Sequence, residues 1–269
     1  STATITDGAT ATITGGLLTT SSASGTVLDS ANAVTSFNAT NSATGVITLV
    51  NTAAPLTITG ISQVGGGSTV TINNTGNISI SGSIATVNPN VTLISTGSIS
   101  ETGGGAISTT GTLTTSSATG LTLNGANIVQ TFNATNSTSG AVSLTNTIGI
   151  LGITGISQTG GGAVTVNNTG SINISGTVAG ATGAVNLTAS GSISESAAGL
   201  ISTSNTLTTS SATGTNLTGG GTNAFSTLNA SNTGAGVINI ANTAALTIAA
   251  ISQTGTGAVT VNNTGTIGI

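Results

Sequence analysis

A block of about 95 residues recurs almost three times along this chain, and this repeat constrains the fold more than any other feature. The segment LTTSSASG begins at Leu18, and LTTSSATG begins at Leu113 and again at Leu207. The segments FNATNSATG, ISQVGGG and VTINNTG also recur, at offsets of 94 to 96 residues. A fixed internal period of this kind indicates structural units that stack around a continuous core. We therefore predict one continuous solenoid over residues 1–269, made of just under three repeats at approximately 1–96, 97–190 and 191–269.

A shorter period is nested within each block. Short segments that alternate apolar and polar residues follow one another at uneven intervals, with leading apolar residues Ile107, Leu121, Val142, Val164, Val185 and Ile201. Such alternation turns one side of a strand inward and the other outward. The pattern predicts about five coils per block, with an average of roughly 19 residues each.

The residues between these segments favour sharp corners. Val164 and Val166 are expected to face inward and Thr165 outward, and the turn Asn167–Gly170 leads to a second strand. Gly and Asn tolerate the positive φ that tight corners require. We predict an all-β chain, a parallel β-helix (β-solenoid) of about 14 coils of roughly 14–23 residues. A β-sandwich is the competing fold, but its core usually contains large aromatic residues and its sequence needs no nested period.

The composition argues against enzymatic function. The chain has no Lys, Arg, His, Cys, Met, Trp or Tyr, and its acidic residues are Asp7, Asp29, Glu101 and Glu195. Imidazole, amine and thiol groups are therefore unavailable as bases or nucleophiles. Transition metals usually require His or Cys, and a calcium loop requires several neighbouring carboxylates. We predict no catalytic, cofactor-binding or metal-binding residues and no cofactor.

The same composition limits the partners. Nucleic acid binding depends on Lys and Arg, with aromatic stacking as a supplement, whereas this chain has a net charge of −4 and three Phe. No apolar run approaches the roughly 20 residues of a membrane helix. We expect no nucleic acid partner and no membrane insertion. The absence of Cys agrees with secretion without a disulfide framework.

Several Asn recur at matching positions in the blocks. They are the single residues Asn51, Asn146 and Asn242 and the pairs Asn73–Asn74, Asn167–Asn168 and Asn262–Asn263. Stacked Asn side chains can form amide ladders, while turn propensity alone would also explain their placement.

Three of the four acids are equivalent in the repeats. Asp7, Glu101 and Glu195 each follow an Ile-(Thr/Ser) pair and lie 94 residues apart, whereas Asp29 has no counterpart. We expect a solvent-exposed corner that keeps neighbouring molecules apart. The alternative is a column of carboxylates that binds cations between filaments.

The aromatic residues also follow the repeat. Phe37 and Phe132 align with Leu228, and Phe225 lies three residues before Leu228 and is a candidate replacement for the lost ring. With one such position per block, we expect these rings to fill the core rather than to stack on a ligand.

Runs such as GAVSLTNT, GAVTVNNTGSINISG and GAVNLTASGSISE resemble the β-helical repeats of filamentous-haemagglutinin-like exoproteins. Those proteins are large bacterial surface adhesins, many of them exported by two-partner secretion. The resemblance covers essentially the whole chain. It implies a right-handed parallel β-helix, a bacterial origin, export to the cell surface and an adhesive or structural role. The chain departs from that family in its complete lack of Lys and Arg.

Two classes of function follow. The first is an extracellular structural or adhesive β-solenoid, part of a surface fibre, filament or large adhesin, whose host-surface or matrix ligand the sequence does not specify. The second is ice binding or another surface-binding function, which requires the same outward position to be Thr on coil after coil. We expect the outward column to be mixed, which disfavours ice binding; it reads Thr48, Thr71, Thr92, Ser108, Ser143, Thr165, Asn186, Ser202, Asn239 and Thr260.

The chain is also expected to associate with itself. An open terminal coil exposes unpaired backbone groups and an apolar cross-section, so a matching coil should cover it. That coil would belong either to a longer parent chain or to a second copy that stacks end to end.

Overall fold

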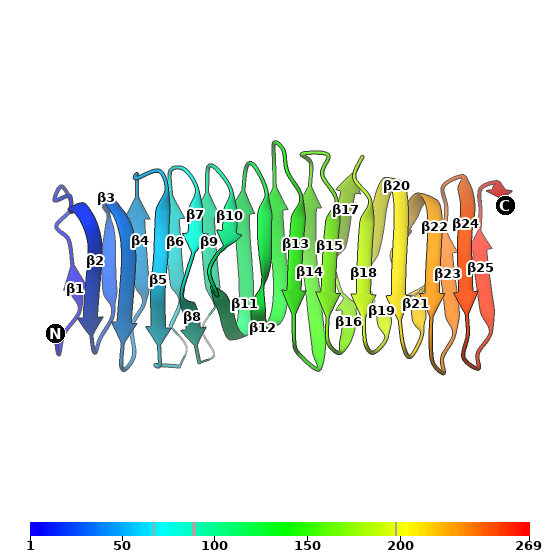
Figure 1. Cartoon of the computed structure of the whole chain (residues 1–269), viewed down its shortest axis with the longest axis horizontal. Coiled ribbons are helices and arrows are strands. Elements are labelled where there is room, and N and C mark those ends of the chain that lie inside the picture. The colour runs from blue at the N-terminus through cyan, green and yellow to red at the C-terminus, as the bar shows by residue number, and fades with distance from the viewer. Residues whose placement is uncertain (67, 88–89, 197) are drawn as a thin grey trace. The chain divides into compact units, whose positions relative to one another are not determined.

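The computed structural model describes residues 1–66, 68–87, 90–196 and 198–269. These residues form two compact units, 1–131 and 132–269. Strands and turns make up both units, and the described residues include no helix (Figure 1). The chain follows the course of a parallel β-solenoid with about 12 turns.

The strands are short and close together in the sequence. The first unit contains β1 (Ile5–Thr6), β2 (Thr14–Ser22), β3 (Thr26–Asn41), β4 (Ile47–Asn51), β5 (Leu56–Gln63), β6 (Val70–Asn74), β7 (Ile78–Ile80), β8 (Ser83–Thr86), β9 (Val91–Ser95), β10 (Ile99–Glu101) and β11 (Ala106–Ser117). Strand β12 (Leu121–Asn136) includes the boundary. The second unit contains β13 (Val142–Asn146), β14 (Ile150–Gln158), β15 (Val164–Asn168), β16 (Ser171–Ile174), β17 (Thr177–Ala181), β18 (Val185–Ala189), β19 (Ile193–Glu195), β20 (Leu200–Ser211), β21 (Thr215–Leu217), β22 (Ala224–Asn232), β23 (Ile238–Asn242), β24 (Leu246–Gln253), β25 (Val259–Asn263) and β26 (Ile267–Gly268).

Each turn of the solenoid is built from three strand segments. In the second unit, β15, β16 and β17 follow one another and pair in parallel with β18, β19 and the first part of β20. In the first unit, β6, β7 and β8 pair in the same way with β9, β10 and the first part of β11. Each unit therefore has three parallel sheet faces around one core.

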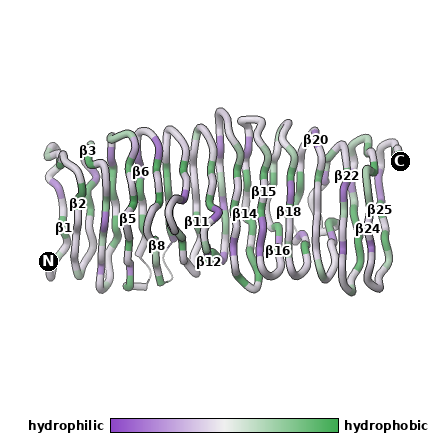
Figure 2. The backbone as a smooth tube through the Cα atoms, in the orientation of Figure 1, coloured by the Kyte–Doolittle hydropathy of each residue, from purple (hydrophilic) through white to green (hydrophobic). Residues whose placement is uncertain are grey.

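The alternation of apolar and polar residues places the core inside the turns. Val164 and Val166 are fully buried, and Thr165 between them is partly exposed. Val164 pairs in register with Val142 on one side and Val185 on the other, so like residues stack along the interior. Figure 2 shows hydrophobic residues recurring along the strands. The predicted parallel, in-register pairing with Val, Ile and Leu inside is confirmed.

The turns are longer than the predicted nested period. Asn146 stacks on Asn168, 22 positions further along the chain, and Asn51 stacks on Asn74, 23 positions further along. The short interval from Ile107 to Leu121 does not close a turn, because these two residues belong to different faces: Ile107 pairs with Ile84, and Leu121 pairs with Ile99. Strands on different faces have similar sequences, which is why their spacing suggested shorter and more numerous coils.

The long repeat is out of phase with the turns. In the first unit, Ile5 heads an inward column that reaches Val91 after four turns, through Thr26, Ile47 and Val70. The equivalent of Ile5 is Ile99, which lies beyond Val91 on the next strand and pairs with Ile78. One repeat therefore spans four turns and about one third of another.

The second unit shows the same shift. Val164 and its equivalent Val259 lie in different columns, because Val164 pairs with Val142 whereas Val259 pairs with Ile238. Ile238 in turn stacks on Thr215 and belongs to a separate face. Equivalent residues of successive repeats thus appear on successive faces. In the described ranges, no helix of the length and apolarity of a membrane span is present.

Candidate functional site

The three equivalent acids are each hydrogen-bonded to a buried Asn one turn further along the chain. Asn32 Nδ2 donates to Asp7 Oδ2 at 2.8 Å, and Asn127 Nδ2 donates to Glu101 Oε2 at 3.1 Å. These carboxyl groups also accept hydrogen bonds from backbone amides of the next turn, including a 2.6 Å bond from Gly125 N to Glu101 Oε2. Each acid therefore connects two successive turns.

The second unit repeats the arrangement. Asn223 Nδ2 donates to Glu195 Oε2 at 3.1 Å, and both residues are buried. The side-chain oxygen Oδ1 of each Asn accepts a hydrogen bond from a backbone N–H. The donors are Ile13 for Asn32, Ile107 for Asn127 and Ile201 for Asn223. We call this arrangement of one acid, one Asn and one backbone amide the carboxylate clamp.

The clamps differ in their electrostatics. Burial raises the pKa of Glu101 and Glu195, and the hydrogen bonds from Asn127 and Asn223 only partly offset it. One oxygen of each glutamate, Oε1, is buried with no hydrogen-bond partner among the described residues. At Asp7 the effect of burial is outweighed by the hydrogen bonds from Asn32 and neighbouring backbone amides, which lower its pKa.

The structure changes both interpretations of the acids. Glu195 is only 8% exposed and so does not lie at a solvent-exposed corner, whereas Asp7 and Glu101 are partly exposed. The acids do not share a column either, because Ile5 and Ile99, which precede Asp7 and Glu101, lie on different faces. The side chain of Asp29 is exposed, although its backbone N–H donates to Asp7.

Of the two explanations for the recurring Asn residues, the structure shows amide ladders. Asn51 Nδ2 donates to Asn74 Oδ1 at 2.8 Å, and Asn146 Nδ2 donates to Asn168 Oδ1 at 3.0 Å. Asn242 and Asn263 repeat the contact at 2.9 Å. The ladders are short: Asn74 stacks next on Ser95, and Asn168 stacks next on Ala189. The preceding residue of each pair, such as Asn73, takes the outward position.

The aromatic residues belong to the core, as predicted. Phe37, Phe132 and Phe225 are fully buried, and so is Leu228. Phe225 does not replace the missing ring at Leu228, because Phe225 pairs with Thr203 and Leu228 pairs with Leu207.

The outward residues do not form one mixed column. In the first unit a single column contains Thr48, Thr71 and Thr92, and it continues to Thr114 on one side and to Val27 and Thr6 on the other. Ser108 lies on another face, where it pairs with Ala85. In the second unit Ser143, Thr165, Asn186 and Thr208 form a column, while Asn239 and Thr260 lie on a different face. The Thr-rich column of the first unit was hidden by combining residues from several faces.

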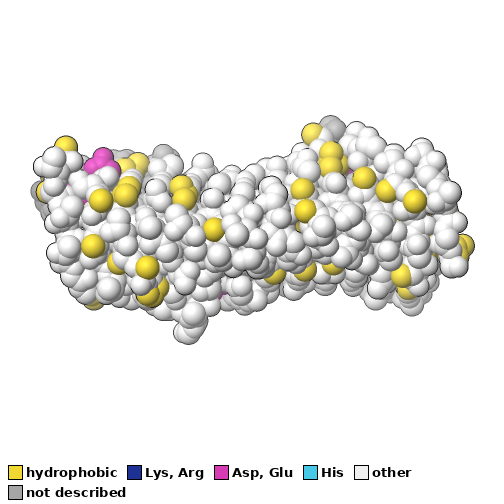
Figure 3. All heavy atoms as spheres, turned by 90° about the horizontal axis from the view of Figure 1, so that it is seen from above, with side chains coloured by type: hydrophobic (Ala, Val, Ile, Leu, Met, Phe, Trp, Pro, Cys, Tyr) yellow, Lys and Arg dark blue, Asp and Glu magenta, His cyan; other side chains and the backbone are white. Residues whose placement is uncertain are grey.

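Much of the molecular surface is uncharged and polar. Figure 3 shows a face of the molecule on which most atoms belong to the backbone or to side chains that are neither charged nor hydrophobic. Among the described residues, no three acidic side chains gather into a group that could hold a metal ion.

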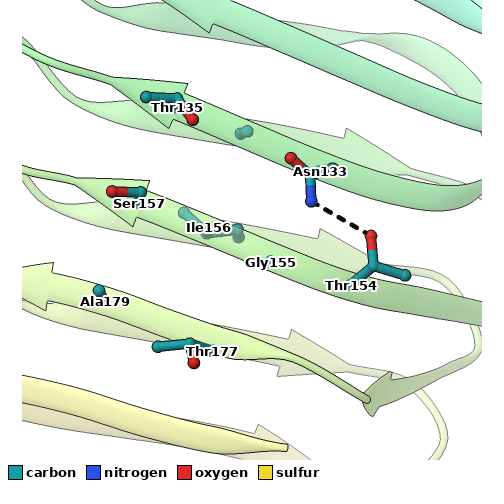
Figure 4. A pocket seen from close by; sticks show the side chains of 9 residues that line it. Asn133, Thr135, Thr154, Gly155, Ile156, Ser157, Thr177 and Ala179 are labelled. Atoms are coloured by element: carbon teal, nitrogen blue, oxygen red, sulfur yellow. Dashed lines mark hydrogen bonds between the residues drawn. The ribbon is translucent and has the colours of Figure 1, made fainter.

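A shallow hollow recurs at equivalent positions in the two units. In the second unit it has a volume of about 390 Å³ and lies at Gly155, between Asn133, Thr154, Ser157 and Thr177 (Figure 4). In the first unit it has a volume of about 290 Å³ and lies at Gly60, beside Asn38, Ser62 and Ser83. We call these two sites the glycine hollows.

Comparison of the chain with protein-family models, curated proteins and solved structures found no match.

The sequence did not draw attention to the clamp Asn or to the glycines of the hollows. Asn32, Asn127 and Asn223 do recur at the repeat spacing, in the segments ANAV, ANIV and TNAF. The periodicity could therefore have found them. Their partners could not be identified in this way, because the hydrogen bonds join residues 25 to 28 positions apart.

Proposed function

We propose that this chain is an extracellular structural or adhesive β-solenoid, part of a bacterial surface fibre, filament or large adhesin. The observation that carries the proposal is that each described turn hydrogen-bonds to the next through its strands and, at intervals, through buried clamps and ladders. Such a construction resists unravelling turn by turn and presents long, regular, uncharged faces.

The resemblance to filamentous-haemagglutinin-like repeats supports the same assignment. It also supplies the right-handed winding and the surface location that form part of this proposal. The net charge of −4 leaves only slight electrostatic repulsion between copies, which favours self-association along or beside a fibre. In this role the chain acts without catalysis, because its acid–base side chains are limited to four carboxyl groups dispersed along the sequence.

Immunogold electron microscopy of the source cells tests this proposal. An antibody raised against residues 1–269 should label fibres or spikes on the outside of intact cells. Beads coated with the purified chain should adhere to host cells or matrix more than beads coated with an unrelated soluble protein. Label confined to the cell interior, together with non-adherent beads, would contradict the proposal.

Ice binding is the second candidate, and the Thr column of the first unit favours it. Thr48, Thr71, Thr92 and Thr114 stack in register on one strand face, with a spacing of about 4.8 Å between strands. A regular array of hydroxyl and methyl groups is suited to ordering water into a lattice. The adjacent outward column is less regular, since it contains Val50, Asn73, Ile94 and Ser116.

Thermal hysteresis of freezing distinguishes this candidate. If the column binds ice, the purified chain should depress the freezing point below the melting point, and T71Y with T92Y should abolish the effect. The matched control is S100Y, which places a bulky ring on another face, where Ser100 pairs with Ser79 and Thr122. Absence of hysteresis in the parent chain would rule out ice binding.

A further inference from the structure

The glycine hollows depend on the absence of one methyl group. A Cβ atom placed on Gly155 would lie 3.0 Å from Nδ2 of Asn133, and one placed on Gly60 would lie 2.9 Å from Nδ2 of Asn38. Such distances are shorter than an ordinary contact, so a methyl group at either position would displace the end of the Asn side chain from its present place. Neither glycine has a positive φ, so the backbone conformation itself does not require glycine.

The hydrogen bonds in the hollows orient the Asn amide. Thr154 Oγ1 donates to the carbonyl oxygen of Phe132 at 3.3 Å and is therefore free to accept from Asn133 Nδ2, at 3.4 Å. The first unit repeats both contacts. Thr59 Oγ1 donates to the carbonyl oxygen of Phe37 at 3.2 Å and accepts from Asn38 Nδ2 at 3.5 Å. Figure 4 shows Asn133 directed toward Thr154 beside the bare backbone of Gly155.

This arrangement leaves hydrogen-bonding capacity in the amide. A carboxamide has two N–H donors and one carbonyl acceptor. Within the described residues, Asn133 and Asn38 each use one donor, and Oδ1 of each has no side-chain or backbone partner. A donor and an acceptor therefore lie next to each other, in one plane, at the edge of each hollow.

The third repeat lacks this arrangement. Its equivalents of Thr154 and Gly155 are Ala249 and Ala250, so the hydroxyl that orients the Asn is absent and a methyl group is added beside it. The corresponding Asn229 is exposed, whereas Asn38 and Asn133 are partly buried. Asn229 pairs with Ala250 in the same bulged register in which Asn38 pairs with Gly60. The fold therefore accepts Ala at this position.

The lining indicates the chemistry of a ligand. An anionic ligand would need Lys or Arg, which the chain lacks, and neither hollow is lined by a carboxylate that could hold a cation. The remaining groups are amide, hydroxyl and small apolar groups. Neighbouring hydroxyls of a sugar ring match an adjacent amide donor and acceptor, and the volumes are close to the lower end, about 300 Å³, of small-molecule sites.

We propose that the glycine hollows of the first and second repeats bind neutral sugar units of a polysaccharide. The inference rests on the proposed adhesive function and specifies its ligand class. Because the hollow occurs in both units, each molecule carries two sites, and a surface that presents many copies of the sugar should bind it with a higher overall affinity than a single site provides.

An array of immobilised uncharged oligosaccharides, built from glucose, galactose, mannose and N-acetylglucosamine, tests the proposal. The parent chain should bind at least one member, and G60A with G155A should weaken that binding by at least about tenfold. The matched control is G16A with G149A, because a Cβ on either glycine meets no atom within 4 Å. The control should bind as the parent does.

A second variant guards against a folding defect. N38A with N133A keeps the hollow but removes the amide, and it should also lose at least about tenfold in binding. Its circular dichroism and thermal midpoint should match those of the parent. No binding by the parent chain, or unchanged binding by both variants, would overturn the proposal.

The bead-adhesion assay separates this inference from the proposed function. Adhesion that persists in G60A with G155A would refute the hollows as the adhesive sites and leave the adhesive function standing. Oligosaccharide binding by a chain that is not displayed on cells would refute the proposed function and leave the sugar sites standing.

Discussion

The side-chain amide of Asn223 donates to Oε2 of Glu195, 28 residues earlier in the chain, at 3.1 Å. Its oxygen accepts the backbone N–H of Ile201 at 2.6 Å, so one buried amide satisfies two groups at once. Equivalent contacts occur at Asn32 and Asn127. The clamp therefore places a hydrogen-bonded polar contact within the interior of each repeat.

Removing a clamp Asn should destabilise the fold. N223A leaves the Ile201 N–H and the Glu195 carboxylate without this partner in a buried environment, which should cost about 1–3 kcal/mol. Urea unfolding measures the change. N239A is the control, since Asn239 takes an outward position in its pair with Asn216 and should change stability by less than about 0.5 kcal/mol. Equal losses in both variants would show that the clamp has no special role.

The clamp glutamates, Glu101 and Glu195, should make the free energy of unfolding fall as the pH rises above their ordinary pKa of 4.5. Burial raises the pKa of Glu101 and Glu195 in the folded chain, so the folded state binds protons more tightly than the unfolded state. Their contribution to the stability of the folded state is fully present below the pKa of the unfolded chain. It is lost as the pH rises through the pKa of the folded chain. Asp7 acts in the opposite sense, because its pKa is lowered from 3.8, and its contribution is lost in acid.

Thermal unfolding between about pH 4 and pH 7 checks this dependence. The parent chain should unfold at a lower temperature at the upper end of this range, and E101Q with E195Q should remove most of the difference, because the glutamine side chain does not titrate. A parent chain whose thermal midpoint is constant or rises over this interval would contradict the assignment.

The buried rings should contribute strongly to stability. F132A removes a fully buried side chain and should cost about 3–5 kcal/mol. F132L introduces the residue that the third repeat has at the equivalent position, Leu228. It should lower the free energy of unfolding by less, about 1 kcal/mol. Denaturant titration of both variants provides the comparison. A negligible change in F132A would mean that the ring faces solvent.

The amide ladder should protect the turn that it crosses. Asn168 Oδ1 accepts from Asn146 and from the Ile148 N–H, and its Nδ2 donates to the carbonyl of Ile148 at 2.9 Å. N168A should therefore cost about 1–3 kcal/mol and speed hydrogen exchange at Ile148. Exchange at Val142, whose N–H bonds to the Ala163 carbonyl, serves as the internal reference. Unchanged exchange at Ile148 would contradict a stabilising role for the ladder.

Local patterns were sufficient for the strands and the core. The alternation of Val164, Thr165 and Val166 predicted which side chains face inward, because the side-chain period of a strand is two residues wherever the strand lies. The Asn ladders were predictable for a similar reason, because in-register stacking places residues at matching positions of neighbouring turns next to each other. The clamps and the glycine hollows were not predicted, because each depends on which distant residue lies one turn away.

The sequence by itself determined that apolar and polar residues alternate along short strands and that the strands of successive repeats stack on one another. It also determined that the apolar residues of the interior are Val, Ile, Leu and a few Phe. The tertiary structure decided how many residues make a turn, and hence which residues are neighbours. Ile5 and Ile99 are equivalent in sequence yet lie on different faces, because one repeat exceeds four turns by about one third. The length of a turn depends on the combined lengths of its strands, corners and bulges. A local sequence pattern describes one of these elements at a time, so it does not predict the length of the whole turn.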